Sequence, residues 1–257
     1  MPGGLPILLP SQAATGSPHS CSPDRQGAYL LGLTDRYRNA TDLPKVLPLF
    51  PLRGAILLPR ASLTLNVFEP RYLALVDHAL AGNRLMGVVQ PAPEAGPGES
   101  PPGKSFPLRR VGCAGRIFSF TESDDGRIAV SLAGVARFVV VRDIDGEEPF
   151  RMCQVDFAPY EEDFVGGCGE DDVDRPRLIA TLRSYLLANN LNADWERINS
   201  ASSERLVNTL SILSPYGPEE KQALLEAPDL RARAEALVAL AEMELAATDD
   251  GSGTSLQ

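Results

Sequence analysis

Gly115-Arg-Ile-Phe-Ser-Phe120 and Arg127-Ile-Ala-Val-Ser-Leu132 are two apolar runs separated by Thr121-Glu-Ser-Asp-Asp-Gly126. β-Branched and aromatic side chains favour an extended backbone. The Asp-Gly pair supplies turn residues that tolerate a positive φ, which a tight connection between antiparallel strands needs. These 18 residues therefore predict a β-hairpin, and the rest of the fold is worked out from it.

Further strands are predicted on both sides of this hairpin. Ser62-Leu-Thr-Leu-Asn-Val-Phe68 alternates apolar and polar residues, which is typical of a half-buried strand. Ala136-Arg-Phe-Val-Val-Val141 and Phe150-Arg-Met-Cys-Gln-Val-Asp156 continue the pattern around Asp145-Gly146. One helix interrupts it, with Pro70 in its first turn and an apolar face of Leu73, Val76 and Leu80. Residues 44–160 are thus predicted to form a small β-barrel or sandwich with one helix.

The second half of the chain has helical periodicity. An acidic linker over residues 161–174 is expected to be solvated and to precede a helical subdomain over 175–247. Ser202 and Ser203 are candidate caps of one helix, Pro218 opens another, and Asp229 precedes the last. Pro, Gly and Ser in residues 1–43 predict a disordered extension, and residues 248–257 a disordered tail. The predicted fold class is α+β.

Composition restricts the class of function. The net charge is -10 and the pI is near 4.8, so the chain as a whole repels a phosphate backbone and nucleic acid is not expected as a partner. No apolar stretch is long enough for a membrane span, and no membrane partner is expected. Four dispersed cysteines without an export signal favour a reduced, cytoplasmic protein.

One string matches the phosphate-loop pattern, Gly98-Glu-Ser-Pro-Pro-Gly-Lys-Ser105. That loop binds phosphate through consecutive backbone N–H groups between a strand and a helix, and Pro101 and Pro102 remove two of these donors. Neither a strand before it nor a helix after it is predicted. We therefore expect a solvated loop and no ATP site.

Catalytic and metal-binding constellations are not apparent. His19 falls in the expected disordered extension and His78 on a helix surface, so a catalytic base is lacking. A Ser-Lys dyad would need Lys45, Lys104 or Lys221, and Lys221 is expected in the exposed first turn of a helix. The histidines and cysteines lack the close spacing of metal ligands, and Cys113 and Cys153 are expected to be buried in strands. No catalytic residue, cofactor or metal is predicted, and the protein is not expected to be an enzyme.

Several motifs, in order along the chain, carry a resemblance to a known family. They are Leu47-Pro-Leu-Phe-Pro-Leu-Arg53, Leu58-Pro59, Leu65-Asn-Val-Phe-Glu-Pro-Arg-Tyr72, Val111-Gly-Cys-Ala-Gly-Arg116, Glu220-Lys-Gln-Ala-Leu-Leu-Glu226 and Asp229-Leu-Arg-Ala-Arg233. With these motifs, the segment from about Leu43 to Ala247 resembles the N-terminal, substrate-binding domain of Lon proteases, as in small proteins made of that domain alone.

The resemblance implies a PUA-like β pseudo-barrel followed by an α-helical bundle. It also implies a non-catalytic module that binds unfolded or extended polypeptide, or a partner protein, without the ATPase and peptidase of full-length Lon. The candidate partner contacts within the motifs are Phe50, Arg53, Phe68, Glu69 and Arg71, although a structural role is the favoured interpretation for each. Phe50 and Phe68 are expected to fill the barrel, Glu69 to interact with the free N–H groups of the helix start, and Arg71 to pair with an acid.

Two alternatives remain open at this point. PUA-like barrels elsewhere bind RNA, which a basic stripe with exposed aromatic residues would support. A cryptic hydrolase would need a deep pocket that holds serine, lysine or histidine with a shifted pKa.

Overall fold

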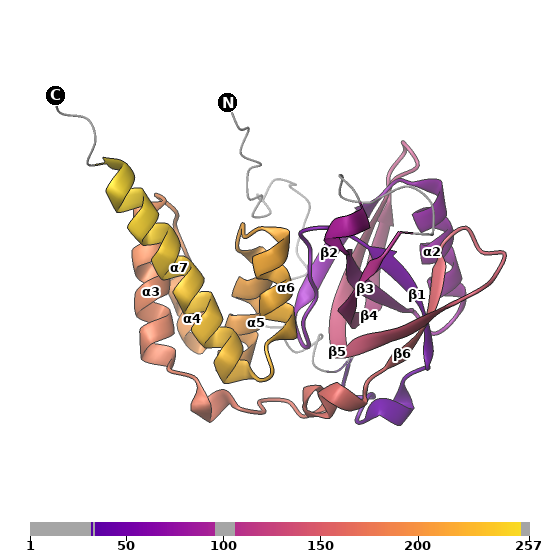
Figure 1. Cartoon of the computed structure of the whole chain (residues 1–257), viewed down its shortest axis with the longest axis horizontal. Coiled ribbons are helices and arrows are strands. Elements are labelled where there is room, and N and C mark those ends of the chain that lie inside the picture. The colour runs from indigo at the N-terminus through magenta and orange to yellow at the C-terminus, as the bar shows by residue number, and fades with distance from the viewer. Residues whose placement is uncertain (1–31, 33, 96–105, 253–257) are drawn as a thin grey trace, which may run out of the picture.

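The computed structural model describes residues 32, 34–95 and 106–252, with the side chains of 248–252 omitted. Most of the predicted N-terminal extension, the phosphate-loop match and the last five residues lie outside this part. The expectation of disorder is wrong for residues 34–43, which include a 3₁₀ helix (Ala40–Asp42) and the buried side chains of Tyr37 and Leu43, because these side chains pack on the core. It is also wrong for 248–252, since the last helix extends to Ser252. The described chain has a six-stranded sheet first and a group of helices after it, as Figure 1 shows. The mixed α+β class predicted from the sequence is confirmed.

The strands are β1 (Val46–Pro51), β2 (Ser62–Val67), β3 (Leu85–Pro91), β4 (Leu108–Glu122), β5 (Ile128–Ile144) and β6 (Arg151–Asp156). Their order in the sheet is β2-β5-β4-β3-β1-β6, and β6 pairs with β5 as well. This second pairing joins β5, β4, β3, β1 and β6 into a closed ring, while β2 extends the sheet beside β5. Only β1 and β3 are parallel. The connection between them contains β2 and the helix α2 (Pro70–Ala81), because parallel neighbours need a crossover.

The predicted hairpin is confirmed, but its second strand is longer than expected. β4 and β5 pair from Val111↔Val139 to Glu122↔Ile128, and Gly126 adopts a φ of 78° in the turn. The two strands expected over 127–132 and 136–141 are one strand with a register shift beside Gly134. A Cβ at Gly134 would lie 1.9 Å from the carbonyl oxygen of Leu58. The apolar pattern breaks there because only glycine permits this close backbone approach.

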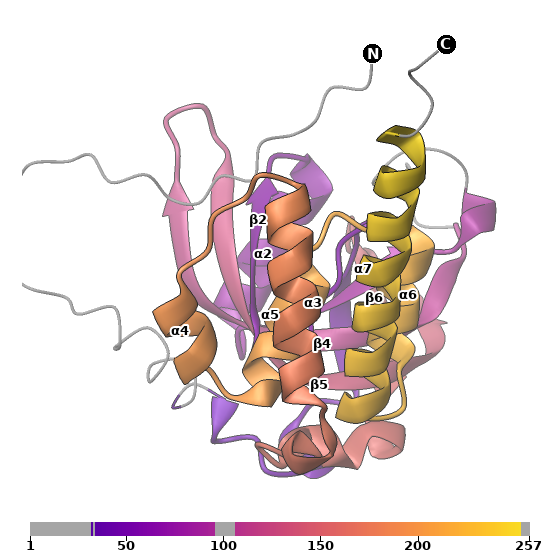
Figure 2. The same ribbon diagram turned by 90° about the vertical axis from the view of Figure 1, so that its left-hand side faces the viewer.

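The helices after the sheet are α3 (Arg175–Ala188), α4 (Trp195–Ser200), α5 (Ser203–Leu213), α6 (Pro218–Glu226) and α7 (Leu230–Ser252). Ser202 caps α5 by accepting a hydrogen bond from the Arg205 N–H, as expected. The short helix α4 was not expected, because six residues are too few for a periodic pattern. Figures 1 and 2 show α3 and α7 side by side, and Figure 1 shows α5 and α6 between them and the strands.

The segment 161–174 is not simply a solvated linker. It contains parts of two 3₁₀ helices, Ala158–Phe164 and Glu170–Asp172, and Asp163 within it is 7 % exposed. Asp163 pairs with buried Arg137 of β5 (2.8 Å), which also donates to the carbonyl oxygens of Leu225, in the last turn of α6, and of Ala227, just after it. A second ion pair joins Arg60 to Glu204 of α5. One hydrophobic cluster includes residues of both halves, so the sheet and the helices share a core.

Candidate functional site

A groove of about 510 Å³ lies where the end of β1, the strand β2 and the start of α2 meet. The residues that line it are Phe50, Leu52, Thr64, Leu65, Asn66, Val67, Phe68, Glu69 and Tyr72. The alternation predicted for β2 is confirmed, because Leu65 and Val67 are buried while Thr64 and Asn66 are exposed. The groove therefore has apolar lining residues and, beside them, the polar side chains of β2.

Aromatic rings and one ion pair shape the end of the groove at α2. The rings of Phe50 and Tyr72 lie 4.3 Å apart between centroids, and the guanidinium of Arg71 lies 4.5 Å from the Tyr72 ring. Arg71 also pairs with Glu69 at 2.8 Å, which confirms the expected pairing with an acid. These contacts hold the side chains in fixed relative positions at the start of the helix.

Two expectations at this site are wrong. Phe68 does not fill the barrel, because its side chain is 63 % exposed beside the groove, whereas Phe50 is buried as expected. Glu69 occupies the N-cap position of α2, but its carboxylate makes no capping hydrogen bond and binds Arg71 instead. The main-chain carbonyl of Glu69 accepts the N–H groups of Tyr72 and Leu73. Strand alternation itself places Phe68 on the same outward face as exposed Thr64 and Asn66, so the expectation of a buried ring rested only on its apolar character.

Arg53 is separate from the other candidates. Its guanidinium donates to the carbonyl oxygen of Ala92, beyond the end of β3, and it does not line the groove. Of the five candidate contacts, Phe50, Phe68 and Glu69 line the groove, and Arg71 borders it through Glu69 and Tyr72.

The strand β2 stands at the end of the strand order and, within the described residues, pairs only with β5. In an antiparallel pair, every second residue directs its N–H and C=O groups away from the partner strand. The outer edge of β2 therefore presents main-chain donors and acceptors beside the groove.

Lys221 corrects the expectation of an exposed lysine. Its side chain is buried, and its Nζ donates to the carbonyl oxygen of Ile212, near the C-terminal end of α5. Burial lowers the pKa of Lys221 to about 8. The spacing to buried Leu224 and Leu225, three and four residues on, is the sequence signal that places Lys221 on the inner face of α6.

A buried lysine with a lowered pKa is one element of a Ser-Lys dyad. A catalytic role would also need a serine within hydrogen-bond distance of the lysine. Ser211 donates its hydroxyl to the Val207 carbonyl, and within the described residues no hydrogen bond joins Lys221 to a serine. The ammonium instead complements the carbonyl end of a helix. We interpret Lys221 as a helix-capping residue.

The remaining reactive groups lie apart from the groove. Cys113 and Cys153 are buried in β4 and β6 as expected, and burial raises the pKa of Cys153 to about 12. His78 is exposed, and its ring contacts the ring of Phe150. Within the described ranges, no group of three or more His, Cys, Asp or Glu residues could hold a metal ion. None of the helices described is both long and apolar enough to cross a bilayer.

The ring of strands, the crossover helix α2 and the helices that follow define a mixed α+β protein. Its candidate binding surface is the groove beside the edge of β2. The model of the ATP-dependent protease La (LON) substrate-binding domain matches residues 46–242, so the chain belongs to that family. The recognition of Lon-type motifs in the sequence is confirmed.

Several relatives and solved structures agree with this assignment. The chain is 26 % identical over 219 residues to a Lon protease of Syntrophus aciditrophicus, covering 82 % of this chain and 26 % of that protein. It is 29 % identical over 202 residues to Lon protease 2 of Myxococcus xanthus, covering 76 % and 23 %. The chain thus spans about a quarter of the length of these relatives.

Two solved structures share the fold. The Lon N-terminal domain protein from Xanthomonas campestris superposes with a TM-score of 0.53 at 24 % identity, over 76 % of this chain and 98 % of that one. The N-terminal domain of the Mycobacterium avium complex Lon protease has a TM-score of 0.54 at 18 % identity, over 77 % and 98 %.

Proposed function

We propose that this domain is a non-catalytic module that binds extended or unfolded polypeptide in the groove beside β2. The single observation that carries the proposal is the outer edge of β2, which pairs with no strand among the described residues and lies directly beside an apolar groove, in a chain of the Lon substrate-binding family. An extended peptide can add to a strand edge through main-chain hydrogen bonds, which makes binding tolerant of sequence. Alternate side chains of that peptide would then enter the groove.

Within this proposal each candidate contact has a role. Exposed Phe68 offers an aromatic surface to apolar client side chains, while Phe50 forms part of the apolar groove wall. The Glu69–Arg71 pair fixes the end of the groove. Arg53 holds the segment after β1 in place by its hydrogen bond to the carbonyl oxygen of Ala92. The ring of strands corresponds in this view to the PUA-like pseudo-barrel, and α3 to α7 to the helical bundle. We propose a cytoplasmic site of action.

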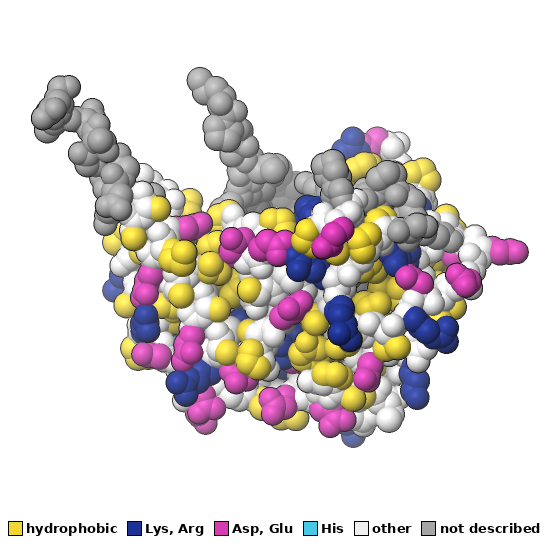
Figure 3. Space-filling view, in the orientation of Figure 1, with side chains coloured by type: hydrophobic (Ala, Val, Ile, Leu, Met, Phe, Trp, Pro, Cys, Tyr) yellow, Lys and Arg dark blue, Asp and Glu magenta, His cyan; other side chains and the backbone are white. Residues whose placement is uncertain are grey.

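Polypeptide is favoured over RNA because of charge. The chain carries a net charge of -10, and Figure 3 shows lysine and arginine interspersed with acidic side chains on the face in view. RNA-binding surfaces are usually dominated by basic charge. Nothing in the groove itself offers a cluster of basic residues.

The test is a titration of a fluorescent, reduced and unfolded protein, in which anisotropy and fragment size are followed together. We expect micromolar or weaker binding, since ordering the client consumes much of the contact energy, and no fragments. Phe68→Ser should weaken binding several-fold. Leu187→Ser, at a side chain of α3 that is 74 % exposed, is the matched control and should bind like the wild type.

Equal binding by both variants would contradict the groove, and no binding to any unfolded client would contradict the function. Fragments that depend on the protein and disappear when one of its serines is replaced would show that it is an enzyme.

A further inference from the structure

A second cavity, of about 530 Å³, lies at the opposite end of α2 from the groove. Its lining residues are Arg36, Tyr37, Asp42, Pro44, Gly82, Asn83, Arg84, Leu85 and Arg116. The two sites are separated by the 12 residues of α2, or about 18 Å at 1.5 Å per residue. The cavity is therefore a site of its own.

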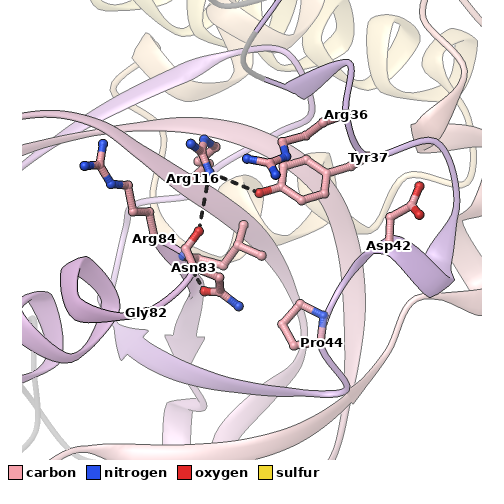
Figure 4. A pocket seen from close by; sticks show the side chains of 9 residues that line it. Arg36, Tyr37, Asp42, Pro44, Gly82, Asn83, Arg84 and Arg116 are labelled. Atoms are coloured by element: carbon pink, nitrogen blue, oxygen red, sulfur yellow. Dashed lines mark hydrogen bonds between the residues drawn. The ribbon is translucent and has the colours of Figure 1, made fainter.

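Three arginines gather in this cavity without acidic partners. Figure 4 shows the guanidinium groups of Arg36, Arg84 and Arg116 on one side of the cavity and Asp42 on the other. Within the described chain none of the three forms an ion pair. Other arginines of this acidic protein, such as Arg60, Arg137 and Arg151, are paired with carboxylates. The cavity thus has a local excess of positive charge, since Asp42 is the one acidic side chain among its lining residues.

Arg116 illustrates this best. One of its terminal nitrogens contacts two uncharged oxygens, the Tyr37 hydroxyl at 3.3 Å and the Asn83 carbonyl at 3.4 Å. Its Nε is buried and has no hydrogen-bond partner among the described residues. A guanidinium that is partly withdrawn from water normally pairs with an anion, because its desolvation is otherwise uncompensated.

The neutral groups of the lining are donors as well. Asn83 Oδ1 accepts the Leu85 N–H, which leaves the amide nitrogen of Asn83 to face the cavity (Figure 4). The Tyr37 hydroxyl accepts from Arg116, so its own proton is available. Asp42 is occupied by the N–H of Arg38. The lining therefore suits a ligand with several acceptor oxygens.

Arg84 occupies its position at a conformational cost. Its φ is 64°, in the left-handed region where glycine would be unstrained. Its N–H donates to Ala79 and its carbonyl accepts from Ile117, so the backbone is held in this turn by hydrogen bonds. An arginine kept in a strained conformation at the mouth of a cationic cavity is consistent with a binding role.

We propose that this cavity binds a small molecule that carries a phosphate monoester. Three guanidinium groups and one carboxylate leave a local charge of about +2, which matches the charge of nearly -2 that a phosphate monoester has at pH 7. Its three terminal oxygens can engage all three arginines, whereas a carboxylate has two oxygens and one charge. The cavity is larger than a phosphate ion, and Tyr37, Pro44 and Leu85 supply an apolar wall for an organic group.

The experiment titrates phenyl phosphate into the full chain by calorimetry, in chloride buffer at fixed ionic strength. Benzoate and inorganic phosphate are titrated in parallel. We expect submillimolar binding of phenyl phosphate, with at least tenfold weaker binding of each of the other two. The double variant R36Q/R84Q should bind phenyl phosphate at least tenfold more weakly, since both arginines are exposed and charge-assisted hydrogen bonds are lost. R205Q removes an exposed arginine of α5 and should leave the affinity unchanged.

The other outcomes overturn the proposal. No binding, or equal loss in R205Q, would mean that the cavity is not an anion site. If benzoate binds as tightly as phenyl phosphate, the cavity is a carboxylate site. If inorganic phosphate binds as tightly as phenyl phosphate, the cavity does not recognise the organic group. Displacement of phenyl phosphate by a short single-stranded RNA at lower concentration would assign the cavity to a phosphodiester backbone. Because the groove is not altered by these variants, client binding there is tested separately.

Discussion

Arg137 and Asp163 form a buried ion pair in which the guanidinium donates three hydrogen bonds to the carboxylate, of 2.8, 2.9 and 3.3 Å. Arg137 belongs to β5, and Asp163 to the segment that leads to the helices. Arg137 also lies over the Tyr160 ring and donates to the carbonyl oxygens of Leu225, in α6, and Ala227, just after it. Burial lowers the pKa of Arg137, but the hydrogen bonds and charge of Asp163 outweigh it and raise the pKa overall. This residue pair is thus one of the contacts that tie both halves of the domain together, beside the Arg60–Glu204 pair and the shared core.

Removing Asp163 should be strongly destabilising. Asp163→Asn leaves Arg137 buried without a counter-charge, for which we expect a loss of about 3–5 kcal/mol in the free energy of unfolding. Urea denaturation of the variant measures the loss. Asp171→Asn, at an exposed position of the same segment, is the control and should change stability by less than about 0.5 kcal/mol. A similar small effect at both positions would show that the pair does not hold the halves together.

The buried lysine predicts a dependence of stability on pH. Because burial lowers the pKa of Lys221 to about 8 from 10.5, the unfolded state binds more protons between these values. The contribution of Lys221 to stability therefore rises as pH increases from about 8 to 10.5, by up to about 3 kcal/mol.

The measurement is the difference in unfolding free energy between the wild type and Lys221→Met at several pH values in this window. The difference is needed because burial also raises the pKa of Tyr185 and Tyr216 to about 12, which lowers stability above pH 10 in both proteins. Lys45→Met, at an exposed lysine, should give a constant difference. If the difference in unfolding free energy between the wild type and Lys221→Met also does not change with pH, burial does not lower the pKa of Lys221.

Gly134 should not tolerate a side chain. Gly134→Ala would place a Cβ 1.9 Å from the carbonyl oxygen of Leu58, and a backbone atom cannot give way as a flexible side chain can. We expect a loss of more than about 2 kcal/mol. Gly146→Ala has open space around its Cβ and should melt within a few degrees of the wild type. Identical melting temperatures of the two variants would refute the close approach.

The helical half should depend on the apolar stripe of α7. Leu237 is 4 % exposed, so Leu237→Asp buries an unpaired charge, which should cost several kcal/mol. Met243→Asp, on the same helix at 69 % exposure, should have little effect. Thermal melts followed by circular dichroism distinguish the two, and a Leu237→Asp protein that melts like the wild type would contradict the burial of this face.

The local pattern of side chains determined most of the secondary structure. Strand alternation in β2, the Asp-Gly turn and the cap at Ser202 depend on residues close in sequence, so the sequence alone predicts each of them. The same local signals predict that Cys113 and Cys153 lie in strands, and both side chains are buried there. Several separated motifs, from Leu47 to Arg233 and in order along the chain, indicated the family.

Only the tertiary structure decided which side chains lie together. Phe68 stays exposed because no described element packs over the outward face of β2 at that point, and Lys221 is buried because α6 packs its first turn against α5. Arg36, Arg84 and Arg116 lie 48 and 32 positions apart in sequence, and no local pattern indicates that they share a cavity. Such sites form from long-range strand pairing and helix packing, whose geometry is set by the whole core and not by neighbours along the chain.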